Sequence, residues 1–221
     1  MNKTDILAQA FKTAVKEFEN YNNNLVNKSL LIMYKDRVSN EFDYITVEFT
    51  GANYYHLTGL LYKDDNQDKT EKYGSRFYAE AKNKKLSISN FKIKDRNTML
   101  KTKALPSISK IWNCSKMIGD YNNNGLELKL DKLIGGNTVC LGLNHIEGKK
   151  YAPASSLYNN TRNYLKTINQ IIAIFIKDNS DAVYKTIKYV AKGVDLKNIK
   201  YFNDLKAIVS LDNYKTKAEQ E

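Results

Sequence analysis

Apolar side chains recur every three or four positions from Ile6 to Tyr21, and beyond this segment they occur in short runs. The first segment has the spacing of an amphipathic helix, and Thr4 stands where a helix cap is expected. We therefore predict a helix over residues 5–21, which the three asparagines at 22–24 should end.

Two short apolar runs follow this helix, LLIMY at residues 30–34 and YITVEF at residues 44–49. Both are rich in β-branched or aromatic residues, which is typical of a pair of strands joined by a polar connection. Residues 75–85 and 95–105 have a composition that favours helices, so the middle of the chain should be mostly helical.

The pattern changes again after Ser115, where short apolar runs such as KMIGDY, LELKL, TVCLGL and KKYAPA are separated by NNNG and GGN. Asparagine and glycine tolerate the positive φ of tight turns, so this half predicts a β meander. Residues 168–177 and 182–190 add two candidate strands, although the first fits a buried helix turn equally well. Only residues 212–221 look disordered.

The composition of the 221 residues, 42% hydrophobic and 27% charged, is that of a soluble globular protein. We divide the chain into a helical extension (1–27), an α+β domain (28–192) and a helical or disordered tail (193–221). No apolar run approaches the roughly 18 residues that span a bilayer, and the start lacks the pattern of a secretory signal, so we expect a cytoplasmic protein without a membrane partner. Cys114 and Cys140 have no ligand-spaced partner, which argues against structural zinc, and no cofactor is implied.

The net charge of +11 is concentrated in one part of the chain. Between Lys82 and Lys116 there are ten basic residues and one acid, whereas the remaining 25 basic and 23 acidic residues nearly cancel. Such a block favours a polyanion, because each neutralised phosphate releases counterions. A solvated lysine face is the alternative. The candidate nucleic-acid-binding residues are Lys82, Lys84, Lys85, Lys92, Lys94, Arg96, Lys110 and Lys116.

One of the two histidines, His56, lies inside the apolar run YYHLTGLL. It is either a core histidine with satisfied ring nitrogens or a group held for proton transfer, and its ordinary pKa near 6.5 suits the second role. His145 lies beside a turn, in LNHIEGKK, and should be exposed.

The order of the motifs carries a resemblance. The motifs follow one another in this order: a strand, YHLTGLLY, a helix with RFYAEA, the spacing Thr98 to Lys101, KMIGDY and a strand ending in YAPASSL. Over about residues 28–190 this resembles a phage- and plasmid-associated group within the barnase/EndoU/colicin/RelE-like nuclease superfamily. The resemblance implies a nuclease-like α+β fold, in which N-terminal helices pack on a curved antiparallel sheet. It also implies metal-independent RNA cleavage, usually by toxins or effectors of mobile elements.

Cleavage of RNA without a metal uses the 2'-hydroxyl as the nucleophile, so a site must move protons and stabilise charge on the phosphorane. His56 suits the first task, and lysines suit the second. The candidate catalytic residues are His56, Thr58, Lys101, Lys103, Tyr151 and Ser155.

Each candidate also has a structural interpretation. On a strand Thr58 would share the face of His56 and could contact a phosphate, but Thr58-Gly59 is also a common turn pair. Lys101 and Lys103, two apart on a helix, should not both enter one site. Ser155 could donate to a phosphate or, with Ser156, cap a helix. Tyr151 could donate a proton or stack on a base.

Two functions remain open from the sequence. The first is a metal-independent endoribonuclease of a mobile element, in which His56 and Ser155 open onto one cleft beside the lysines. The second is an inactive basic scaffold that binds nucleic acid or a host protein complex, for example to interfere with a defence system. RNA is favoured over DNA as the partner, and a host protein or an antitoxin or immunity protein is the other candidate.

Overall fold

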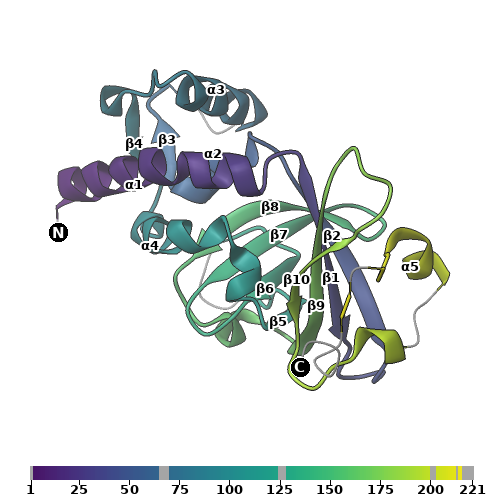
Figure 1. Ribbon diagram of the computed structural model, residues 1–221. Coiled ribbons are helices and arrows are strands. Elements are labelled where there is room, and N and C mark those ends of the chain that lie inside the picture. Colours follow the sequence, from purple (N-terminus) through teal and green to yellow (C-terminus); the bar gives the residue numbers. More distant parts are fainter. Residues whose placement is uncertain (1, 65–69, 124–127, 200–202, 213, 216–221) are drawn as a thin grey trace.

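The computed structural model describes residues 2–64, 70–123, 128–199, 203–212 and 214–215. Figure 1 shows two parts side by side: helices α1 to α4 with a small two-stranded sheet, and a larger body of strands. Helix α5 (Asn203–Ile208) lies on the far side of the strands from this helical part. The site discussed below lies where the two parts meet.

Helix α1 (Lys3–Asn24) confirms the predicted N-terminal helix and extends it at both ends. The Asn2 side chain caps it by accepting a hydrogen bond from the Asp5 amide at 2.8 Å. Ala10, Ala14 and Phe18 recur at four-residue spacing and are buried, so this stripe faces the core.

Seven strands form one closed ring. They are β1 (Lys28–Lys35), β2 (Phe42–Phe49), β8 (Lys150–Leu157), β7 (Cys140–Glu147), β6 (Lys132–Gly135), β5 (Met117–Asp120) and β9 (Asn169–Asp178), in spatial order, and β9 pairs back with β1. Strand β10 (Thr186–Val190) also pairs with β9. The predicted strand at 168–177 is therefore confirmed.

The closed ring makes the predicted curved antiparallel sheet wrong, while the α+β class holds. Strand β1 is paired along both edges: Ile32 lies opposite Ile45 of β2 and opposite Ile174 of β9. A second departure is the parallel pair β2–β8, where Val47 lies opposite Tyr151. Closure satisfies the backbone groups that an open antiparallel sheet leaves at its edges.

One buried cluster joins the barrel to the helices. Its strand members include Ile32, Val47, Ile134 and Leu141, and its helical members include Phe18, Tyr54 and Leu105. A separate cluster contains Leu31 and Phe175 of the barrel together with Leu196 and Leu205, so the C-terminal segment packs on β1 and β9.

The remaining elements form the helical part. Helix α2 (Asn53–Thr58) is followed by β3 (Leu60–Tyr62), α3 (Thr70–Lys82), β4 (Phe91–Ile93) and α4 (Thr98–Ile108). Helices α3 and α4 confirm the two helices predicted in the middle of the chain. The predicted strand at 126–130 falls partly outside the described residues, and residues 128–130 have no regular structure. Most of residues 212–221 also lie outside the described residues.

Candidate active site

Helix α2 presents His56, and the histidine is half-buried between the fully buried Tyr55 and Leu57. On a strand, His56 and Thr58 would share a face. They lie instead on a helix, where residues two apart point to different sides, so the two side chains do not line one surface.

Thr58 and Gly59 end this helix. The buried Thr58 hydroxyl donates to the Tyr55 carbonyl at 2.8 Å and accepts from the Leu60 amide at 3.1 Å. Gly59 adopts a left-handed φ of 74°, and a Cβ there would lie 3.0 Å from the Cα of Thr98. The Thr-Gly pair thus has the structural role, and the predicted contact of Thr58 with a phosphate is not supported.

Helix α4 holds the end of α2 through two side chains. Thr98 donates its hydroxyl to the Gly59 carbonyl at 3.0 Å, and the amine of Lys101 donates to the His56 carbonyl at 3.1 Å. Lys101 is 2% exposed, and burial lowers its pKa to about 8, with the positive charge of Lys94 acting in the same direction and Asp95 opposing it. Lys103 is exposed. Of the two predicted lysines, Lys101 therefore lies at the histidine.

Strand β8 holds the other side of α2. Ser156 donates its buried hydroxyl to the Leu57 carbonyl at 3.0 Å, and the side-chain Nδ2 of Asn53 donates to the Pro153 carbonyl at 3.3 Å. Asn53 and His56 are three apart on α2, so His56 lies on the side of the helix that Asn53 directs toward β8.

Ser155 points away from α2. In the β7–β8 ladder Leu141 lies opposite Ser156 and Gly142 opposite Ser155, and neighbouring side chains of a strand point to opposite faces. The buried Ser155 hydroxyl has no hydrogen-bond partner among the described residues. The serine beside the histidine helix is therefore Ser156, and Ser155 and His56 do not open onto one cleft.

Tyr151 is distant from Ser156, the serine that bonds α2. It lies five residues before Ser156, which is about 16 Å along an extended strand. Burial raises its pKa, and its ring packs edge-on against the ring of His145 at 5.3 Å. His145 is exposed, as predicted, and its Nε2 lies 2.9 Å from the Gly148 carbonyl oxygen.

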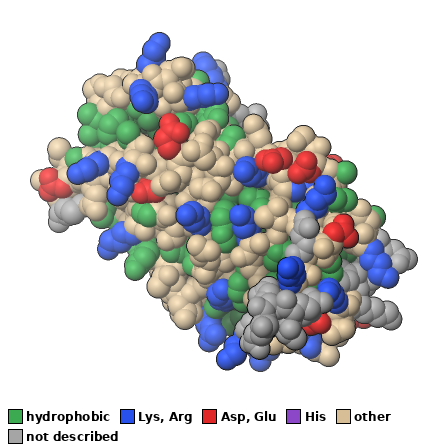
Figure 2. Space-filling model, in the orientation of Figure 1, with side chains coloured by type: hydrophobic (Ala, Val, Ile, Leu, Met, Phe, Trp, Pro, Cys, Tyr) green, Lys and Arg blue, Asp and Glu red, His purple; other side chains and the backbone are tan. Residues whose placement is uncertain are grey.

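The basic block is exposed but not gathered in one place. The exposed members are Lys82, Lys84, Lys85, Lys92, Lys94, Arg96, Lys103, Lys110 and Lys116. Figure 2 shows basic side chains spread over the helical part and the strands on the face drawn. The amine of Lys116 lies 3.5 Å from the centroid of the Tyr189 ring.

Lys94 and Arg96 line a groove of about 360 Å³ together with Lys3, Thr98 and one acid, Asp95. Thr98 bonds Gly59, so this groove adjoins the contact between α2 and α4. Lys3 was not among the predicted residues, because nothing in the local pattern brings the start of α1 to α4. Asn53 was not among them either, and Ser156 was not distinguished from Ser155, although strand alternation separates the two serines once the register is known.

No group of three or more His, Cys, Asp or Glu side chains within the described residues could hold a metal ion. None of the helices in that part of the chain combines the length and the apolar character needed to cross a membrane.

Comparison with protein families agrees with the resemblance of the motifs. The family model described as phage-Barnase-EndoU-ColicinE5/D-RelE like nuclease4 matches residues 15–193. No curated protein and no solved structure matches the chain. The match includes α2, α4 and β8, the three elements that meet around His56. The chain therefore belongs to the phage-Barnase-EndoU-ColicinE5/D-RelE like nuclease4 family.

Proposed function

We propose that this nuclease cuts RNA without a metal ion, with His56 accepting the proton of the attacking 2'-hydroxyl. The observation that carries the proposal is the anchoring of α2: Lys101 and Ser156 fix consecutive carbonyl groups, those of His56 and Leu57, in a helix whose histidine is half-buried. A histidine held in this way is positioned before the substrate binds.

The reaction forms a bond from the 2'-oxygen to phosphorus and breaks the bond from phosphorus to the 5'-oxygen. The 2'-hydroxyl proton passes to His56, and the leaving oxygen takes a proton from water or from a basic side chain. The products are a 2',3'-cyclic phosphate and a free 5'-hydroxyl.

The charges suit this reaction. Lys94, Arg96 and Lys3 beside the helix contact can hold the phosphates of the strand and stabilise the negative charge of the phosphorane. Lys101 acts as a positioning residue, because its amine contacts the backbone of His56. The other histidine, His145, lies in the β7–β8 hairpin with Tyr151, so His56 acts without a second histidine. Cleavage should therefore be slower than at a site with two histidines.

We place this activity in a toxin or effector of a mobile element, acting in the cytoplasm of the cell that contains it. An inhibitory protein partner would fit such a role. The family supports the nuclease class, and the RNA substrate rests on the proton chemistry available at His56.

The test compares wild type, His56→Gln and His145→Gln on RNA in the presence of EDTA. Glutamine keeps much of the shape and hydrogen bonding of histidine but cannot titrate near neutrality. His56→Gln should lose about 100- to 10,000-fold in cleavage rate with little change in melting temperature. His145→Gln, on the exposed hairpin, should cut at the wild-type rate.

A substrate with a 2'-deoxy sugar at the cut position should resist cleavage, and the product should carry a cyclic phosphate. A His56→Gln variant that melts several degrees lower yet cuts RNA normally would make His56 a structural residue. The proposal would also fail if wild type cut RNA only before EDTA was added.

A second candidate is an inactive scaffold that binds nucleic acid or a host protein complex. Two observations favour it. The Thr58 hydroxyl bonds the backbone of its own helix, and Ser155 points away from α2, so His56 has fewer polar side chains beside it than the sequence predicted. If His56→Ala leaves the biological effect intact and charge reversal of Lys94 and Arg96 abolishes it, the protein acts by binding.

A further inference from the structure

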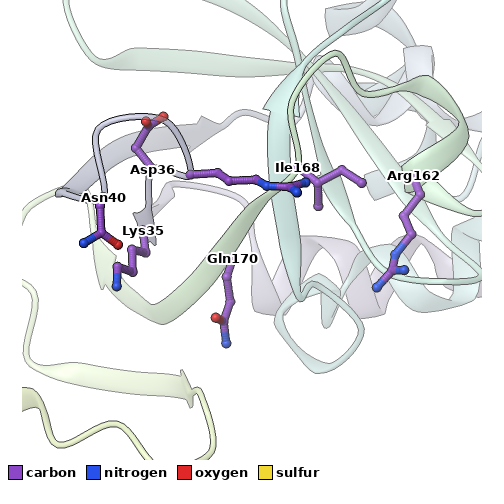
Figure 3. Close-up of a pocket in the computed structure, with 7 residues that line it drawn as sticks. Lys35, Asp36, Asn40, Arg162, Ile168 and Gln170 are labelled. Atoms are coloured by element: carbon purple, nitrogen blue, oxygen red, sulfur yellow. The ribbon is translucent and has the colours of Figure 1, made fainter.

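A second basic pocket lies at the end of the barrel. It has a volume of about 420 Å³ and is lined by Lys35, Asp36, Arg37, Asn40, Arg162, Ile168 and Gln170. Figure 3 shows Lys35 and Gln170 extending to the same side of the ribbon, with Arg162 facing them across the opening. The volume is within the usual range of ligand sites, about 300 to 1,000 Å³.

The chain segments that form this pocket are fixed by hydrogen bonds. The Arg37 amide donates to Asn169 Oδ1 at 3.0 Å, which ties the β1–β2 connection to β9. The Arg162 amide donates to Asn160 Oδ1 at 3.1 Å, which caps the short 3₁₀ helix η3 (Thr161–Tyr164). Both arginines therefore project from backbones that are held before any ligand binds.

The cations of the pocket are available for a ligand. Lys35, Arg37 and Arg162 form no ion pair with any carboxylate of the described residues. Asp36 is the one acid in the lining, but its Oδ1 accepts from the backbone amides of Val38 and Ser39, and its Oδ2 accepts from the side-chain Nδ2 of Asn169. The pocket thus presents three cations against one carboxylate that is already satisfied.

The lining favours a phosphate over a base or an apolar group. Ile168 is the one apolar residue and no aromatic ring lines the pocket, so a base has no surface on which to stack. The two guanidinium groups can each bind an anion through two parallel hydrogen bonds, and the amides of Asn40 and Gln170 add donors. We propose that this pocket is a second phosphate site, which holds the backbone of an RNA strand away from His56.

The position of the pocket sets the length of RNA that it can affect. Lys35 lies opposite Gln170 at one end of β1, and Lys28 lies opposite Phe49, shortly before α2, at the other end. The eight residues of β1 separate these ends by about 23 Å. Only a strand of several nucleotides can reach both sites.

The test measures binding of single-stranded RNA of about 16 and about 4 nucleotides by fluorescence anisotropy, over a range of salt concentrations. It uses His56→Gln protein so that the RNA is not cut. Adding Arg37→Ala and Arg162→Ala should weaken binding of the long RNA on the order of tenfold and reduce its log-log salt slope by about 1.4. Binding of the short RNA, which cannot reach both sites at once, should weaken less.

The matched control is Lys12→Ala with Lys16→Ala, which removes two exposed charges from α1. An equal loss in this control would show a general effect of charge and overturn the proposal. Unchanged binding of the long RNA would also overturn the proposal. The same holds if the arginine substitutions weaken binding of an acidic peptide such as polyglutamate but not binding of RNA. This phosphate site depends on the proposed function in one respect, which is that the ligand is RNA. A wild type that binds RNA through Arg37 and Arg162 but does not cut it would support this site and refute the nuclease mechanism.

Discussion

The side-chain amine of Lys101 lies 3.1 Å from the backbone carbonyl oxygen of His56, so a buried cation caps the helix that presents the histidine. Burial of this amine disfavours its charged form, and the hydrogen bond to a helix C-terminal carbonyl compensates part of that cost.

Lys101 should make stability depend on pH. Its pKa falls from 10.5 to about 8 on folding, so between about pH 8 and 10.5 the unfolded chain binds more protons than the folded protein. The contribution of Lys101 to the free energy of unfolding should therefore rise with pH in this window, by up to about 1.4 kcal/mol per pH unit.

The rise can be measured by chemical denaturation at about pH 7.5 and about pH 9.5, on either side of the folded-state value. Lys101→Met should remove it, whereas Lys103→Met, at an exposed position of the same helix, should keep it. The same pH dependence in wild type and Lys101→Met would show that the amine is not buried as described.

The two adjacent serines of β8 should respond in opposite ways to substitution. Ser156→Ala removes the hydrogen bond to the Leu57 carbonyl and should cost about 1 to 3 kcal/mol of stability. Ser155→Ala removes a buried hydroxyl that has no partner among the described residues, so it should be neutral or stabilising.

Thermal melting and RNA cleavage of the two serine variants provide the comparison. Ser156→Ala should also slow cleavage, because α2 loses one of its anchors. A larger loss of cleavage for Ser155→Ala than for Ser156→Ala would indicate that Ser155, the serine predicted from the sequence, is the one that contributes to cleavage.

Gly59→Ala should lower the stability by more than the cost of the left-handed backbone conformation alone. The left-handed φ of 74° costs an alanine about 1 kcal/mol, and its methyl group would also press on Thr98 at 3.0 Å. Gly193→Ala is the matched control, because Gly193 has a φ of 80° with nothing within 4 Å of the added Cβ. If the two variants have equal melting temperatures, α2 and α4 are not in close contact.

Binding of RNA should fall steeply with salt, since each phosphate contact on a single strand contributes about 0.7 to the log-log slope. Lys94→Ala with Arg96→Ala, in the groove beside Thr98, should reduce this slope more than Lys82→Ala with Lys85→Ala. A flat salt response of wild type would indicate a protein partner instead.

Local pattern was enough to predict the three longest helices and most strands, because each has its own apolar spacing. It was not enough to predict the barrel, because Ile32 pairs with Ile174 and nothing in the sequence of either segment indicates that the two strands are neighbours. It also failed at Thr58, where six residues are too few to distinguish a helix from a strand by periodicity. The candidate site was predicted as a set of residue types, while the register of β8 decided between Ser155 and Ser156.

The closure of β1 on β9 has a consequence for the cell that makes this protein. The last residue of β1 is 35 and the last residue of β9 is 178, so 143 residues must be translated between the two halves of that pairing. At bacterial and eukaryotic synthesis rates this takes roughly 7 to 30 seconds. Ser156, which anchors the histidine helix, also leaves the ribosome a hundred residues after His56. A growing chain therefore carries His56 in an unassembled site until β8 and β9 have been made, and any activity should begin only after that point.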